Sequence, residues 1–134
     1  MFKLIKIQNS GINVPELEKH TKSYSKVIKA GEALIFDEGE MASCPTNTMP
    51  THMSFANAGE DVDYVICYPI TGDMLFETTI KNDPSALFTG SKVTLGKDTD
   101  NCSICVTADT NSGFVTIVDK MDATKAGDKV TVKF

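Results

Sequence analysis

Two cysteines three residues apart, Cys102 and Cys105, have the spacing that is most suggestive of chemistry in this sequence. A redox pair with this spacing works at the start of a helix, where the helix dipole lowers the pKa of a thiol. Val106 and Thr107 follow instead and favour a strand. Positions i and i+3 of a strand point to opposite faces. We therefore expect two structural cysteines that neither share a metal nor form a disulfide.

The other candidates for catalysis or metal binding lack the partners that such sites need. His20 and His52 are the only histidines, and neither stands in an H-E-x-x-H pattern. Residues 60–63 (EDVD) lack the spacing of a calcium loop, and Cys44 and Cys67 are not paired by the short spacing typical of zinc ligands. Neither a nucleophile elbow nor a glycine-rich phosphate loop is present. The sequence therefore predicts no catalytic residue, no metal ligand and no cofactor.

The charge of the chain argues against a nucleic-acid-binding surface. The 134 residues carry a net charge of −5, and all 13 basic residues are lysines. Arginine, the usual bidentate reader of phosphate and guanine, is absent. No apolar run reaches the roughly 18 residues of a membrane span, and residues 1–8 are too interrupted for a signal peptide. We therefore expect a protein made in a reducing cytoplasm, with thiols rather than disulfides.

The elements that position these side chains are expected to be short strands separated by turns. Residues 90–95 (GSKVTL) recur as residues 127–132 (GDKVTV), and residues 31–35 (GEALI) are a looser relative. Each phrase begins with a glycine suited to a tight turn and continues into residues suited to a strand. At this length the pattern predicts a small, single-domain, mostly β protein, either a β-barrel or a sandwich.

Turn residues and apolar alternation give approximate bounds for these elements. Strands are expected at residues 32–36, 63–70, 74–80, 92–96, 102–107, 114–118 and 129–133. Residues 41–52 carry two prolines and are expected to form a loop. Residues 82–84 (NDP) predict a short helical turn at 83–88.

Residues 1–29 lack this turn-and-strand rhythm and are expected to form an N-terminal arm ahead of a β-barrel domain at residues 30–134. Phe2, Leu4, Ile5 and Ile7 suit a short strand. Asn13 suits the cap of a helix whose first turn is residues 14–16, and an extended arm is an equal alternative.

Phrases spread over nearly the whole chain resemble the small decoration, or cement, proteins of tailed bacteriophages and prophages. The Tyr68 to Glu77 phrase and the opening residues are similar to those of prophage members from Gram-positive, clostridial-type hosts. The resemblance rests on the order of residues 1–7, 14–16, 30–34, 50–54, 68–77, 113–119 and 126–130.

This resemblance implies a non-enzymatic structural protein on the outside of a phage capsid. It implies that the chain binds the major capsid protein, stabilises the shell and assembles as a homo-oligomer, with a trimer favoured. Apolar residues of the arm would then contact the capsid or a neighbouring copy by strand addition; completing the protein's own barrel is the alternative. The candidate contact residues are Phe2, Leu4, Ile5, Ile7, Val14 and Pro15.

Two other classes of function stay open at this point. A cytoplasmic barrel that binds a small ligand, or an enzyme subunit, would require Cys67, His52, Tyr64 and Asp73 to converge on one pocket. An SH3-like partner-binding module would require an exposed aromatic groove, for which a chain with no Trp and three Tyr offers little material.

Overall fold

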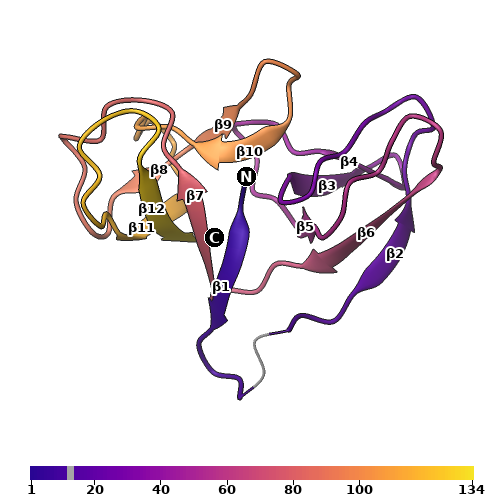
Figure 1. Ribbon diagram of the computed structural model, residues 1–134, viewed down its shortest axis with the longest axis horizontal. Helices are drawn as coiled ribbons and strands as arrows, with labels where there is room; N and C mark the ends of the chain where they lie inside the picture. The colour runs from indigo at the N-terminus through magenta and orange to yellow at the C-terminus, as the bar shows by residue number, and fades with distance from the viewer. Residues whose placement is uncertain (12–13) are drawn as a thin grey trace.

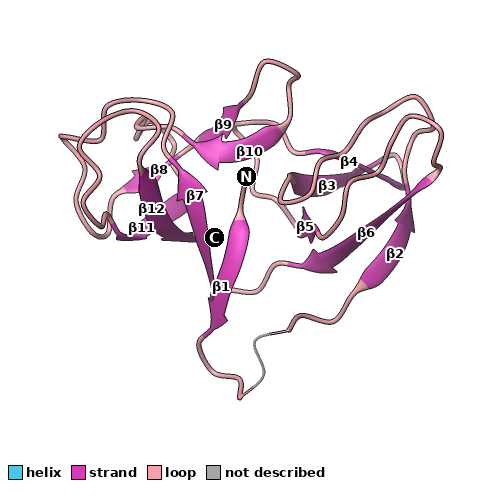
Figure 2. Ribbon diagram, viewed as in Figure 1, coloured by secondary structure: helices cyan, strands magenta, loops and turns pink. Residues whose placement is uncertain are grey.

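The structure is a computed structural model that describes residues 1–11 and 14–134. The described residues form strands joined by loops and turns, and no helix occurs among them (Figure 2). The strands are β1 (Lys3–Ile7), β2 (Glu18–Thr21), β3 (Ala33–Asp37), β4 (Glu40–Ser43), β5 (His52–Ser54), β6 (Tyr64–Pro69), β7 (Met74–Thr79), β8 (Lys92–Val93), β9 (Leu95–Lys97), β10 (Ser103–Val106), β11 (Val115–Asp119) and β12 (Lys129–Lys133).

The strands are arranged in two five-stranded sheets and one two-stranded sheet. The first sheet has the order β1-β7-β12-β11-β8, the second has the order β2-β6-β5-β3-β4, and β9 pairs with β10. In Figure 1 the two larger sheets form separate lobes, and β1, the edge strand of the first sheet, lies on the side that faces the second. The prediction of a small, mostly β domain is confirmed, but the described strands form antiparallel sheets and no closed barrel.

The second sheet is curled, because its two edge strands approach each other. Lys22, just after β2, forms a parallel bridge with Met41 of β4. The curled sheet encloses a small apolar cluster, and the Lys22 side chain is buried with its Nζ donating to the carbonyls of Ser23 and Lys26. The cluster comprises Ile28, Leu34, Met41, Ala58, Val65 and Cys67.

The larger core lies between the first sheet and the inner strands of the second. Phe76 and Val132 of the first sheet belong to it, together with Ala33, Met53 and Tyr68 of the second. Both β6 and β7 are interior strands of their sheets, and Tyr68 of β6 and Phe76 of β7 are buried in this core. The shared core joins the two lobes into one domain.

A glycine predicted to make a tight turn also joins the amino-terminal segment to this core. Gly31 has a φ of 76°, and a Cβ at this position would lie 2.5 Å from the Phe2 carbonyl oxygen. The Phe2 N–H donates to the Gly31 carbonyl at 3.0 Å. Only glycine permits this close approach without displacing the backbone.

Residues 1–29 contribute strands to both large sheets. β1 pairs with β7, and β2 pairs with β6. Phe2 is 3% exposed and contacts the rings of Phe76 and Phe134. The apolar residues of β1 are therefore held in the first sheet of the protein itself.

Two local predictions were wrong. The turn near residues 83–88 is a single hydrogen-bonded turn, with Leu87 N–H donating to Pro84, and not a helix; Asp83 accepts the Ser85 N–H and stabilises a non-helical turn. β4 occupies part of the expected loop at 41–52, because Glu38 and Gly39 both have positive φ and reverse the chain into a hairpin.

The helix considered as an equal alternative to an extended arm would begin at Asn13, a residue that lies outside the described part of the chain. Residues 14–17 are irregular, and β2 follows at Glu18. Pairing with β6 satisfies the backbone of this segment, so tertiary pairing prevails over a weak helical preference.

Candidate functional site

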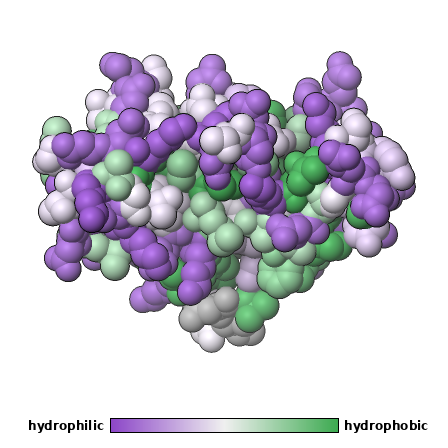
Figure 3. All heavy atoms as spheres, turned by 45° about the horizontal axis from the view of Figure 1, so that its top comes forward, coloured by the Kyte–Doolittle hydropathy of each residue, from purple (hydrophilic) through white to green (hydrophobic). Residues whose placement is uncertain are grey.

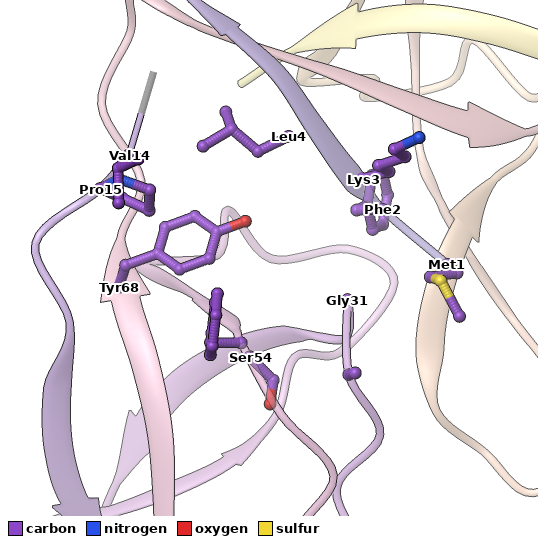
Figure 4. A pocket seen from close by; sticks show the side chains of 11 residues that line it. Met1, Phe2, Lys3, Leu4, Val14, Pro15, Gly31, Ser54 and Tyr68 are labelled. Carbon is purple, nitrogen blue, oxygen red and sulfur yellow. The ribbon is translucent and has the colours of Figure 1, made fainter. Parts of the chain in front are cut away.

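An apolar pocket of about 480 Å³ lies beside β1, where the two lobes meet (Figure 4). Leu4 of β1, Tyr68 of β6 and Phe55, just after β5, form part of its wall. Val14 and Pro15 approach Tyr68 from the loop after β1. Segments far apart in the sequence therefore build this pocket.

Four of the six predicted contact residues line the pocket: Phe2, Leu4, Val14 and Pro15. Val14 is 71% exposed at the rim, whereas Phe2 is buried in the core. Ile5 and Ile7 are not among the lining residues. The structure thus brings together most of this set, but as a pocket wall and not as a free arm.

An irregularity in the pairing of β1 explains why Ile5 is more exposed to solvent than its apolar neighbours on the strand. The pairing with β7 shifts between Leu4 and Lys6, so Ile5 has no partner in the register. A bulge of this kind redirects side chains and bends the strand. Ile5 is 41% exposed, whereas Ile7, after the bulge, is buried in the core.

The polar group contributed by Tyr68 does not make the pocket an acid–base site. Burial raises the pKa of the Tyr68 hydroxyl to about 12, so this group is neutral at physiological pH. Phe55 is 55% exposed next to it. The pocket is therefore suited to receiving an apolar side chain. In Figure 3, hydrophobic surface gathers in the middle and lower part of the face shown, whereas the projections at its upper edge are mainly hydrophilic.

The cysteines do not form a reactive centre. All four are free thiols and buried. Burial raises the pKa of Cys44 and of Cys102 to about 12 and that of Cys67 to about 11, and it also raises the pKa of Cys105. A thiol with a raised pKa carries little thiolate at neutral pH and is a poor nucleophile.

Sequence reasoning missed a cluster of Glu18, His20 and His52. Glu18 and His20 alternate along β2, and His52 lies on β5; these two strands flank β6. The Nε2–H groups of His20 and His52 both donate to Oε2 of Glu18, over 2.7 and 3.2 Å. The E-x-H alternation of β2 was the only available signal, because His52 is 32 residues away from His20 in the sequence.

The environment of the cluster sets its charges. Hydrogen bonds, chiefly from His20, hold the pKa of Glu18 below its ordinary value, so the carboxylate is ionised. Burial lowers the pKa of His52, and its hydrogen bond to Glu18 opposes this shift. The Phe36 ring packs edge-on against both imidazoles, with centroids 5.0 and 5.4 Å away. The cluster is thus a carboxylate facing two imidazoles beside an apolar wall.

The four residues named for a small-ligand site do not line the apolar pocket. His52 belongs to the cluster with Glu18, and Cys67 is buried inside the curled sheet. Tyr64 stacks with the Lys19 ammonium, which lies 4.0 Å from its ring centroid. Asp73 accepts a hydrogen bond from Thr71. Their placement gives no support to a catalytic pocket built from these residues.

Within the described residues, no helix is long and apolar enough to cross a membrane. No protein-family model matches the chain, and no curated protein matches its sequence. The fold is similar to that of the head fiber gp8.5 N base in bacteriophage phi29, with a TM-score of 0.57 and 16% sequence identity. The match covers 89% of this chain and 94% of that chain, so it extends over both lobes.

Proposed function

We propose that this chain is a structural protein of a phage virion that binds the outer surface of the head and stabilises it, as a decoration protein does. One observation carries the proposal: the fold matches a phage head-fibre base over nearly the full length of both chains. The order of sequence phrases that resembles decoration proteins supports the same class independently. The clostridial-type host stays a prediction.

The apolar pocket and its rim are the proposed contact with the major capsid protein. Val14 and Phe55 expose large apolar side chains at the rim, and the lining beneath them is mainly apolar. Apolar anchors that enter pockets contribute much of the affinity of protein interfaces. An apolar side chain of the capsid surface would fill the cavity beside Tyr68.

A non-enzymatic role is part of the proposal. The four thiols are buried with raised pKa values, and the apolar pocket contains no convergent set of ionised groups. These features favour a binding role over a small-ligand enzyme. The acidic net charge of −5 is compatible with the exterior of a DNA-filled shell.

Sedimentation with capsids tests the proposal. Purified protein is mixed with heads that lack it, from the phage or prophage whose genome encodes this chain, and the pelleted fraction is measured against protein concentration. We expect saturable binding, and heads with bound protein should resist heating better than bare heads. Absence of binding at micromolar concentration would refute the capsid role.

The oligomeric state is a separate part of the proposal. The decoration proteins that the sequence resembles favour a trimer, so we expect trimers in solution or on the capsid. Sedimentation equilibrium of the free protein and copy number per capsid measure this. A monomer bound at one copy per capsid subunit would contradict the trimer and leave capsid binding intact.

A further inference from the structure

The imidazoles of His20 and His52 both contact one carboxylate oxygen of Glu18. The proposed capsid role does not involve this cluster. The ligand atoms of Glu18, His20 and His52 all lie within 4.8 Å of one another. They come from two strands held on either side of β6. Their backbones are therefore fixed by the sheet, and side-chain rotations alone adjust the distances.

The donor set has the composition of a known class of metal site. Two histidine nitrogens and one carboxylate oxygen are ligands that Zn²⁺ binds at about 2.0–2.2 Å, leaving a fourth position for water. Tetrahedral ligands at such distances lie about 3.3 Å apart. His52 Nε2 already lies 3.2 Å from Glu18 Oε2, whereas the 2.7 Å between His20 Nε2 and this oxygen would lengthen on metal binding. An ion would replace the protons that the imidazoles now direct at the carboxylate.

A second contact orients one imidazole for this role. His52 Nδ1 lies 2.9 Å from the hydroxyl of Thr51. When Nε2 binds a metal, Nδ1 carries the proton and donates it to an oxygen, which fixes the ring and its tautomer. The Thr51 hydroxyl is placed to accept that hydrogen bond. His52 itself is almost buried, whereas Glu18 and His20 are partly exposed and give access from solvent.

We propose that Glu18, His20 and His52 form a binding site for one divalent transition-metal ion of the zinc class. The ion would link β2 to β5 across β6, and Phe36 would shield one side of it. Because β2 is an edge strand of the curled sheet, this link would stabilise the folded chain in proportion to metal occupancy.

Titration with Zn²⁺ and Co²⁺ tests the site in the full-length, tag-free protein. We expect one ion per chain at pH 7.5, a rise in Tm with added Zn²⁺ that a chelator reverses, and a visible Co²⁺ spectrum typical of nitrogen and oxygen ligands. Glu18→Gln and His20→Gln should each weaken binding by about 100-fold or more, beyond the 10–100-fold loss typical of residues that only support a ligand.

Glu60→Gln is the matched control, because Glu60 is an exposed carboxylate outside the cluster. This variant should bind the ion as the parent chain does. Far-ultraviolet circular dichroism without metal establishes that each variant is folded. The proposal would be overturned if the parent chain bound no metal at 100 μM, a concentration on the order of a hundred times a micromolar Kd. It would also be overturned if the Glu18 and His20 variants bound the metal as tightly as the parent chain does. A thiolate-to-cobalt absorption band would overturn it too, because cysteines would then be the ligands.

Discussion

The rings of Phe2 and Phe134 meet edge to face, with their centroids 5.3 Å apart. Both also contact Phe76 on β7, the strand to which β1 and β12 pair from opposite sides. This aromatic cluster places the amino-terminal strand in the same core as the carboxy-terminal strand. The opening residues of the chain are therefore part of the packing of the first sheet.

Replacing Phe2 with alanine should lower the free energy of unfolding by about 3–5 kcal/mol, because it leaves a cavity between Phe76 and Phe134. Urea denaturation followed by circular dichroism measures the change. Phe88→Ala is the control, since Phe88 is 69% exposed, and it should change stability by less than about 0.5 kcal/mol. Equal effects of the two substitutions would show that Phe2 is not packed in the core.

A chain that begins at Ala30 tests whether residues 30–134 are a domain by themselves, as the sequence predicts. Such a chain lacks the partners of one edge of β7 and of β6. From these contacts we expect loss of cooperative unfolding, exposure of apolar surface and binding of a hydrophobic dye. A sharp, two-state urea transition with unchanged sheet content would instead support an arm that the domain does not need.

Gly31→Ala should destabilise the fold more than Gly39→Ala does. Both glycines have positive φ, so both substitutions incur the left-handed penalty of about 1–2 kcal/mol. At Gly39 a Cβ meets no atom within 4 Å, whereas at Gly31 it would lie 2.5 Å from the Phe2 carbonyl oxygen. The difference between the unfolding free energies of the two variants measures the cost of the contact with the Phe2 carbonyl oxygen. A difference near zero would contradict the close approach of Gly31 to Phe2.

Asp128 should make stability depend on pH in the acid range. Hydrogen bonds from the backbone N–H groups of Thr124 and Lys125 hold the pKa of Asp128 below its ordinary value of 3.8. The Asp128 carboxyl group thus binds a proton less tightly in the folded state than in the unfolded chain. The stabilisation is present above the ordinary value and is lost as pH falls through the lower folded-state value.

The test compares the parent chain with Asp128→Asn over this pH range by urea denaturation. At neutral pH the parent chain should have a higher free energy of unfolding than Asp128→Asn. This difference should shrink toward zero in acid. A difference that stays constant with pH would show that the carboxylate charge is not responsible.

Val14→Ser and Phe55→Ser should weaken capsid binding by about tenfold or more, because each removes an apolar contact at the pocket rim. Both side chains are exposed, so the unfolding free energy should change little. Tyr24→Ser is the control, since Tyr24 is exposed but does not line the pocket. Cosedimentation with heads measures the affinity, and unchanged binding by both rim variants would place the contact elsewhere on the protein.

Local patterns in the sequence were sufficient to predict most strands. The repeated glycine phrases correspond to turns at Gly31, Gly90 and Gly127, all with positive φ, and to the strands that follow them. The alternation of apolar and polar residues and the presence of β-branched residues are local signals for a strand. They can therefore be recognised in the sequence without a structure.

The sequence by itself therefore determined a small, mostly β protein with turns at defined glycines. Tertiary structure decided where β1 and β2 pair, which residues line the apolar pocket, and that Glu18 and His20 meet His52. These relationships depend on which strands become neighbours in a sheet. Strand pairing over long separations is set by the collective burial of the core and not by the residues adjacent in sequence.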